Sequence, residues 1–472
     1  MNYSLAAYPW AEFSFFHTFQ SATGRNIALD WPYVGLLPGY IFWNWLPGGK
    51  NFGTGDSYHR TNRIGRHSLN IHLSQVLRFY GRDMPENVPV TKRLLEKMPR
   101  ERRSSFPLTR FLLVGTEELT QAAAVPENLP LARHFENMGQ VFFRSGSGPE
   151  DTYALFTAGG TLEQHRHFDN NNFVIYQKGF LALDTGTRPE PGMHLYNYYC
   201  RTVAHNCILI HLPGERMPSY WGRPTGSPAH GEEAGHAPND GGQCRTVGSK
   251  VVAFETTENY AYLAGDATEC YHQDKCRLAL RQFVFVPPDH FIVFDRVSST
   301  KAEYKKTWLL HTATEPAIRQ TEFSADQGEG RIFCRTILPE TAELSKIGGP
   351  GKQFWSGGRN WPLPQGYRTP DSTRLLGQWR VEISPRRANE DDLFLHLIQV
   401  GDRSLQEMAQ SELVKKDNRA GVRFAAGQTE CEVLFGTGGA PSGHIIIRKS
   451  GVTVADRDLA GQVTPQKGLT GI

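Results

Sequence analysis

The chain has 472 residues, of which 39% are hydrophobic and 21% charged, so the composition excludes a disordered protein and indicates about three globular domains or two large ones. Its 51 Lys and Arg against 48 Asp and Glu leave a net charge of +3, which disfavours nucleic acid as a general partner. No apolar run approaches the roughly 20 residues of a transmembrane helix, so no membrane span is expected.

The first part of the chain is predicted to be helical. Its opening residues are rich in aromatic side chains and lack the basic stretch that begins a signal peptide. They have the pattern of a core segment, so we expect the sequence to begin inside a longer protein. Residues 68–80 and 90–98 carry apolar side chains at helical spacing, after an aromatic, Gly- and Pro-rich stretch at 31–55. Residues 1–135 are therefore predicted to form a helical domain.

From about residue 138, short runs rich in β-branched and aromatic side chains alternate with turn signals. Clear examples are 140–144, 153–157, 172–177, 180–184 and 291–297. So many short strands are typical of a large antiparallel β-sandwich. The predicted fold class is α+β, with a central β-sandwich over residues 136–385. Residues 386–472 are predicted to add strands to that sandwich or to form a small second β domain.

The seven cysteines are odd in number and include no CxxC motif. In a chain of this size that pattern disfavours a disulfide framework or a cysteine-based zinc site. Buried free thiols are expected instead.

Four residues have the types and order of a divalent metal site. His165 and His167 are two apart and would project from the same face of an extended chain. Asp184 ends a run predicted to form a hairpin with residues 172–177, and His205 lies further on. Imidazoles with one carboxylate suit zinc in tetrahedral geometry. The same spacing also occurs in ordinary strands with solvent-facing histidines, so the pattern alone leaves both interpretations open.

The order of these motifs resembles the heparinase II/III-like polysaccharide lyases, and heparinase II more than heparinase III. The matching phrases are His165-Arg-His167-Phe-Asp169, Tyr176-Gln-Lys178-Gly179, Asp184-Thr-Gly186 and Arg201-Thr-Val-Ala-His205-Asn206. Residues 276–297 resemble the paired strands of the family that end in Asp-Arg-Val. The resemblance covers residues 138–300 well and the flanks more loosely.

The resemblance implies a partial N-terminal (α/α) toroid, of which this chain would hold a remnant, followed by a large antiparallel β-sandwich. It also implies one structural zinc ion, held by His167, Asp184 and His205. His165 would be the active-site histidine. Asp169 has no role in that assignment and is interpreted as a turn residue or hydrogen-bond acceptor.

Lyases of this family cleave the glycosidic bond at C4 of a uronic acid by β-elimination. The C5 proton is acidic only when the neighbouring carboxylate is neutralised, and protons must move at C5 and at the leaving oxygen. The resemblance implies His165 as base or charge stabiliser, with an upstream tyrosine. Tyr3 is the first candidate and Tyr8 the second, although both also suit packed core aromatics. A further histidine and glutamate of the family site would lie upstream of this tyrosine, where the given sequence holds neither.

Three more residues are candidates for substrate contacts. Gln164 precedes His165 and has an amide that suits the substrate carboxylate. Tyr196 and Arg201 lie between two candidate zinc ligands, where loop packing explains them equally well.

The sequence therefore predicts a lyase for an acidic, uronate-containing polysaccharide of the heparin or heparan sulfate kind. The alternative is a non-catalytic, zinc-stabilised β-sandwich fragment that binds carbohydrate. A third hypothesis is a cupin-like metalloenzyme, because HxH with an acid and a distal histidine also describes that class. The resemblance implies the periplasm or cell envelope, although no signal peptide is present in the sequence. The oligomeric state stays open between a monomer and a homodimer.

Overall fold

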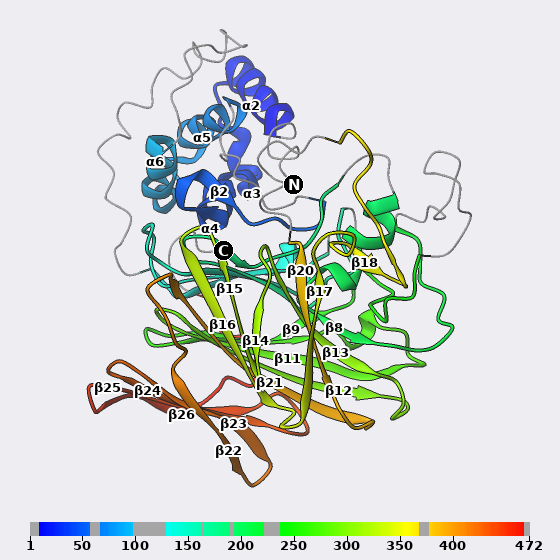
Figure 1. Cartoon of the computed structure of the whole chain (residues 1–472). Coiled ribbons are helices and arrows are strands. Elements are labelled where there is room, and N and C mark those ends of the chain that lie inside the picture. The colour runs from blue at the N-terminus through cyan, green and yellow to red at the C-terminus, as the bar shows by residue number, and fades with distance from the viewer. Residues whose placement is uncertain are drawn as a thin grey trace. The chain divides into compact units, whose positions relative to one another are not determined.

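The computed structural model describes residues 9–56, 67–97, 129–161, 165–188, 193–220, 237–367 and 377–466. The chain divides into two compact units, one drawn from residues 1–52, 60–129 and 466–472 and the other from residues 53–59 and 130–465. Figure 1 shows that the first unit is mainly helical and that the second is built of strands. The predicted α+β class, with a small helical part before a large antiparallel β region, is confirmed.

The helical unit packs short helices around aromatic side chains. Its elements are α2 (Pro9–Thr23), η1 (Ile27–Asp30), α3 (Pro32–Gly35), α4 (Leu37–Asn44), β1 (Trp45–Leu46), η2 (Pro47–Gly49), β2 (Lys50–Asn51), α5 (His67–Tyr80), η3 (Pro85–Asn87) and α6 (Val88–Lys97). Phe13 and Phe16 of α2 share one buried cluster with Val76, Phe79 and Tyr80 of α5. The helix predicted over residues 68–80 is confirmed as α5, while the toroidal arrangement stays a prediction.

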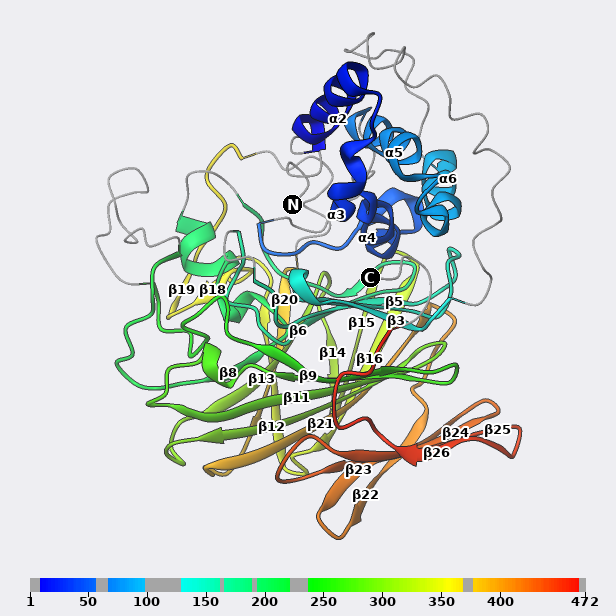
Figure 2. The ribbon, with the colours of Figure 1, turned by 180° about the vertical axis from the view of Figure 1, so that it is seen from behind.

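The β unit contains three layers of antiparallel strands, which Figures 1 and 2 show from opposite sides. The middle layer is an eight-stranded sheet in the order β14 (Ala317–Arg319), β15 (Glu322–Gln327), β16 (Gly330–Leu338), β21 (Asp391–Asp402), β12 (His290–Ser299), β11 (Cys276–Val286), β10 (Ala261–Asp266) and β9 (Lys250–Thr256). Residues 276–297 thus form the adjacent antiparallel strands β11 and β12, as predicted.

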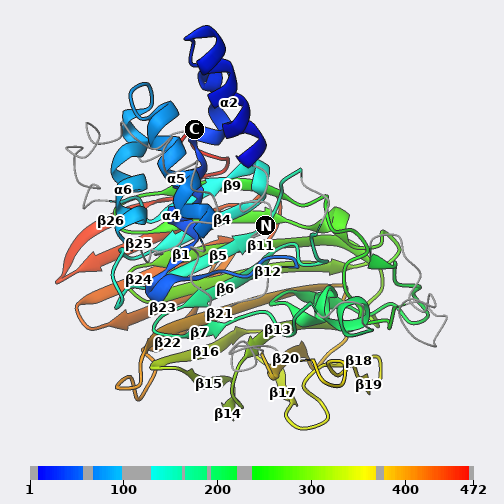
Figure 3. The same ribbon diagram turned by 90° about the horizontal axis from the view of Figure 1, so that it is seen from above.

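Two smaller sheets cover one face of the middle layer. The first has the order β3 (Ala132–Phe135), β4 (Gln140–Arg144), β5 (Tyr153–Thr157), β6 (Asn172–Tyr176) and β7 (Phe180–Ala182), and the second has the order β17 (Ala342–Gly348), β20 (Trp379–Pro385), β13 (Lys306–Thr312) and β8 (Ile208–Ile210). Figure 3 shows β4 to β7 side by side. The segment after β17 includes the small hairpin β18 (Trp355–Ser356) and β19 (Arg359–Asn360).

The third layer is a five-stranded meander on the other face. Its strands are β22 (Gln410–Lys416), β23 (Arg419–Ala426), β24 (Thr429–Gly436), β25 (Gly443–Lys449) and β26 (Val452–Asp458). Alternate side chains of β11 enter two different cores: Phe283 and Phe285 pack toward the smaller sheets, and Val284 packs toward the meander. Because successive strand residues point to opposite faces, a strand that is apolar throughout is suited to a middle layer.

One buried ion pair ties this middle layer to the loops above it. Arg281 of β11 binds Asp295 of β12 through Nε, at 2.7 Å from Oδ1, and both side chains are almost fully buried. Its Nη1 donates to the backbone carbonyls of Asn171 and Asn206, each at 2.6 Å. These two asparagines belong to the segments that carry the histidine motifs. Arg281 therefore anchors both segments to the middle sheet.

Candidate active site

The motif residues come together at the ends of β5, β7 and β8. The segment between β5 and β6 carries His165 and His167, Asp184 follows β7, and His205 follows a short helical turn, η7 (Thr202–Ala204). The predicted hairpin is confirmed, because β6 pairs antiparallel with β7 across a turn at Lys178.

His205, Asp184 and His167 lie close together inside the protein. Nδ1 of His205 is 3.1 Å from Oδ1 of Asp184, and the rings of His205 and His167 are 5.3 Å apart between centroids. All three side chains are almost completely buried. Burial lowers the pKa of His205, but the neighbouring carboxylate of Asp184 outweighs it and raises the pKa above the usual histidine value.

The backbone at His165 differs from the extended conformation that was predicted. Its φ of 61° places it in the left-handed region, so the HxH segment is an irregular turn and not an extended strand. The prediction that both histidines share a strand face is therefore wrong. They nevertheless converge, because both reach the same carboxylate, that of Asp56.

Asp56 lies 109 residues before His165 and binds both motif histidines. Its Oδ2 is 2.5 Å from Nδ1 of His165, and its Oδ1 is 3.2 Å from Nε2 of His167. Arg188 Nη1 is 3.0 Å from Oδ2, and the Tyr220 hydroxyl donates to Oδ1 at 3.0 Å. Burial alone would raise the pKa of Asp56, but His167, then His165 and Arg188, lower it to about 2.

Backbone contacts fix the segment that carries Asp56. The Asp56 N–H donates to the carbonyl of His165 at 3.1 Å, and the Tyr199 hydroxyl donates to the carbonyl of Gly55 at 3.2 Å. Gly55 has a φ of 54°, and a Cβ there would overlap the carbonyl oxygen of His165. Only glycine allows this close approach of two backbones.

The structure also brings Asp169 to this cluster. Its side chain is 2% exposed, and burial raises the pKa of its carboxyl, while His205 and His167 oppose that rise. Asp169 therefore faces the charges of the candidate metal ligands. The interpretation of Asp169 as a turn residue agrees with the bond from the Asn172 N–H to its backbone carbonyl at 3.0 Å, but it did not place the carboxyl among these histidines.

The predicted substrate-contact residues have mixed outcomes. Arg201 is fully buried, and its guanidinium donates to the carbonyls of Pro218 and Gln243 and lies over the ring of Phe168. Tyr196 is also buried. This geometry favours a structural role for both over a sugar contact. Tyr3, Tyr8 and Gln164 lie outside the described residues.

Asp56, Arg188 and Tyr220 are site residues that the sequence did not reveal, and Tyr199, which also lies between the candidate zinc ligands His167 and His205, joins them. The Tyr199 ring packs edge-on against His167, with centroids 4.6 Å apart. None of the four carries a local motif, and Asp56 is remote in sequence. The one available signal was the Gly-rich setting of Asp56, at Gly53 and Gly55.

The donor set suits zinc by chemistry. Nδ1 of His167 and Nε2 of His205 are buried and make no hydrogen bond within the described part of the chain. A buried ring nitrogen without a hydrogen-bond partner is costly, and a metal ion would satisfy it. Over the described residues, however, no three His, Cys, Asp or Glu side chains already have a metal-holding arrangement. Zinc at His167, Asp184 and His205 therefore stays a proposal.

Residues 127–356 match the family model described as heparinase II/III-like, C-terminal. That stretch is similar to the C-terminal domain of the heparinase II/III-like proteins. Among the site residues named above, Tyr3, Tyr8, Gly53, Gly55 and Asp56 lie outside the matched residues, and the others lie within them. A search of curated proteins finds no match.

Solved structures share the fold of this chain at low identity. Heparan sulfate lyase HepC from Pedobacter heparinus has a TM-score of 0.54 at 14% identity, over 90% of this chain and 52% of that one. The heparinase III BT4657 gene product gives 0.53 at 14% identity, over 89% and 51%. Another heparinase III gives 0.53 at 13% identity, over 87% and 53%. The chain thus spans about half the length of these proteins. The closer likeness to heparinase II stays a prediction.

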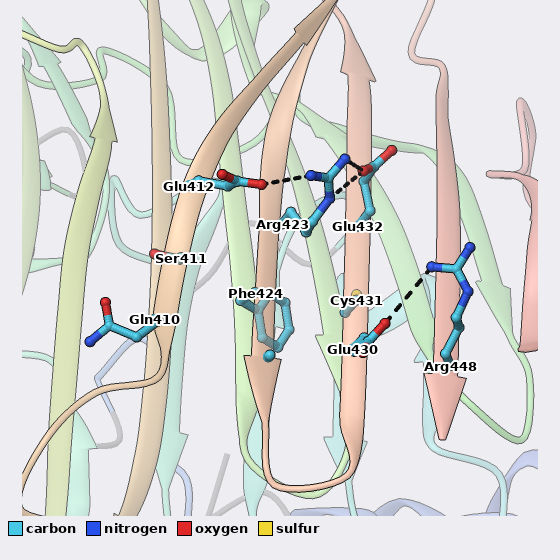
Figure 4. Close-up of a pocket in the computed structure, with 10 residues that line it drawn as sticks. Gln410, Ser411, Glu412, Arg423, Phe424, Glu430, Cys431, Glu432 and Arg448 are labelled. Atoms are coloured by element: carbon cyan, nitrogen blue, oxygen red, sulfur yellow. Dashed lines mark hydrogen bonds and ion pairs between the residues drawn. The ribbon is translucent and has the colours of Figure 1, made fainter. Parts of the chain in front are cut away.

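A separate hollow of about 550 Å³ lies on the five-stranded meander. Figure 4 shows Arg423 between Glu412 and Glu432, and each pair has a contact of 2.6 Å. Arg448 is 4.0 Å from Glu430. The arginines are compensated by neighbouring carboxylates, which would repel a polyanion. The hollow therefore does not replace the histidine cluster as the candidate active site.

Membrane insertion through a helix has no support in the structure. Among the described residues, no helix is long and apolar enough to cross a bilayer.

A buried histidine beside the site predicts a pH-dependent stability. Nδ1 of His194 donates to the Trp361 carbonyl at 2.7 Å, and its Nε2 accepts from the Thr187 N–H at 3.2 Å, so the ring is neutral. Burial lowers its pKa from 6.5 to about 4. The unfolded chain then binds this proton more readily, so stability falls as the pH drops from 6.5 to about 4. We expect a loss on the order of 3 kcal/mol from this group.

Urea unfolding at several pH values checks this expectation. His194→Gln should be less stable at pH 7 but should lose less stability on acidification than the wild type. His272→Gln, at an exposed histidine, is the control and should keep the wild-type slope. If the free energy of unfolding falls equally with decreasing pH in wild type and His194→Gln, His194 is not the group responsible for the pH dependence.

Proposed function

We propose that the chain is part of a polysaccharide lyase that cleaves acidic, uronate-containing polysaccharide of the heparin or heparan sulfate kind by β-elimination. The observation that carries this proposal is the difference in exposure among the three clustered imidazoles. The side chain of His165 is 29% exposed, whereas those of His167 and His205 are 0% exposed. Only the first can meet a substrate, and the other two suit an internal supporting site.

The proposed chemistry assigns proton transfer to His165 and an upstream tyrosine. His165 would take the C5 proton of the uronate or stabilise the charge that develops on its carboxylate. Nδ1 of His165 faces Asp56, so a proton transfer to substrate would use Nε2. Tyr3, or else Tyr8, is proposed as the partner that transfers a proton at the leaving oxygen, and Gln164 as a contact for the substrate carboxylate.

One zinc ion is proposed at His167, Asp184 and His205. When bound, it would supply structural support by holding three buried side chains together, and it would take no part in proton transfer. Two ring nitrogens of the set are otherwise unsatisfied, which supports the proposal. The periplasm or cell envelope is proposed as the compartment from the family alone.

A direct assay tests the lyase proposal. The purified chain would be incubated with heparin, heparan sulfate, chondroitin sulfate and alginate, and the ultraviolet absorbance of the unsaturated uronate product would be followed. A rise with one of the glycosaminoglycans supports the proposal. Binding without a rise in absorbance supports instead the carbohydrate-binding module. Elemental analysis that finds iron or manganese, with oxygen consumption, would favour the cupin-like alternative.

A ligand variant tests the zinc proposal. His167→Ala is expected to lower zinc affinity at least ~10–100-fold and to lower the melting temperature of the zinc-loaded protein, because metal binding contributes to folding free energy. His165→Ala is the matched control and should keep its zinc. Equal loss of zinc in both variants would mean that the roles of the two histidines are exchanged.

A further inference from the structure

The carboxylate of Asp56 is shared between the candidate catalytic histidine and a candidate zinc ligand. All four of its side-chain partners are donors: His165 and Arg188 at Oδ2, and His167 and Tyr220 at Oδ1. The side chain of Asp56 is 4% exposed, so water does not compete for these contacts. Asp56 lies outside the residues that match the family model.

An ionised carboxylate only accepts hydrogen bonds, so each histidine must present an N–H to it. His165 then carries its proton on Nδ1 and keeps the Nε2 lone pair, while His167 carries its proton on Nε2 and keeps the Nδ1 lone pair. Nδ1 of His167 is the buried atom that makes no hydrogen bond within the described residues. It is also the atom that a metal would need.

We propose that Asp56 is a positioning residue that sets the tautomer and ring orientation of both His165 and His167, and so couples the catalytic histidine to the zinc site. The proposal rests on the proposed function. A ligating histidine commonly donates its other N–H to a carboxylate, which orients the ring and strengthens the ligand. Here one carboxylate does this for a ligand and for the exposed histidine two residues before it.

The backbone contacts of the segment make this proposal testable. The Asp56 N–H bond to His165 and the Tyr199 bond to Gly55 do not involve the carboxylate. Replacing the side chain therefore leaves the main-chain contacts of residues 55 and 56 in place. Asp56→Asn keeps the size of the side chain but offers one acceptor oxygen in place of two.

The experiment compares wild type, Asp56→Asn, His165→Ala and a control variant. Asp326→Asn is the matched control, because Asp326 binds Arg331 through both oxygens at 2.7 and 2.9 Å, away from the site. Zinc affinity would be measured by competition with a chromophoric chelator, and kcat and KM with the glycosaminoglycan that the assay identifies. Nitrogen-15 spectra of histidine-labelled protein would report the tautomers.

Asp56→Asn is expected to weaken zinc binding about 10–100-fold and to lower kcat with little change in KM. It should also remove the Nε2-protonated signal of His167. His165→Ala should lower kcat alone, and Asp326→Asn should change none of these readouts. If Asp56→Asn does not fold, Asp56→Glu, which keeps the charge but displaces its oxygens, is expected to show the same losses.

Two outcomes separate this inference from the proposed function. Wild type that binds zinc and cleaves substrate, with zinc affinity and tautomers unchanged in Asp56→Asn, overturns the positioning role alone. Wild type that neither binds zinc nor cleaves any of the four polysaccharides overturns both. If Asp56→Asn raises KM but leaves kcat, zinc affinity and the histidine tautomers unchanged, Asp56 is a substrate contact, and this result also overturns the inference.

Discussion

Replacing His165 with alanine is expected to lower kcat for unsaturated-uronate formation by about 10²–10⁴-fold, the range for loss of a general acid or base. His165 is the partly exposed imidazole of the cluster, and its Nδ1 contacts Asp56. Removing it takes away the proton acceptor without emptying the protein core. The zinc content and the melting temperature should therefore stay near wild-type values. Steady-state rates and elemental analysis of the same preparations check both statements.

The control for this variant is His272→Ala. His272 is an exposed residue of the same unit. Its Nδ1 lies 3.5 Å from the carboxylate of Asp274. Its replacement should leave kcat unchanged. A His165→Ala protein with more than about a tenth of wild-type activity would contradict a direct catalytic role.

Replacing Arg281 with methionine is expected to destabilise the β unit by about 3–5 kcal/mol, because it leaves a buried carboxylate without its partner. Burial raises the pKa of Asp295, and Arg281 opposes that rise. The same guanidinium also holds the carbonyls of Asn171 and Asn206. The free energy of unfolding in urea measures the loss, and zinc affinity should fall with it because both ligand segments lose an anchor.

Arg423→Met is the matched control for this effect. Arg423 also binds two oxygens of carboxylate partners, but its side chain is 55% exposed on the outer meander. Exposed ion pairs contribute only about 0–1 kcal/mol. If both variants lost the same small amount, the buried pair would not anchor the site segments. The double variant Arg281→Met, Asp295→Leu should recover part of the loss, since no unpaired charge remains.

Local pattern was sufficient to predict the strands and the order of the motif residues. The runs rich in β-branched and aromatic side chains at residues 140–144 and 153–157 correspond to β4 and β5, and the turn at Lys178 correctly predicted the hairpin that leads to Asp184. Neighbouring residues decide such elements, because side-chain alternation and turn conformation depend on a few φ and ψ angles. The same pattern did not reveal that β11 and β21 form a middle layer between two cores.

By itself the sequence determined the fold class and the predominance of β-strands after about residue 138. It also determined which residue types are available for a zinc site at His167, Asp184 and His205. Only the tertiary structure decided that Asp56 joins that cluster and that His165 is exposed while His167 is buried. The physical reason is that the Asp56 contacts span 109 and 111 residues. Contacts at that separation depend on how whole layers pack, and no local period of the chain encodes them.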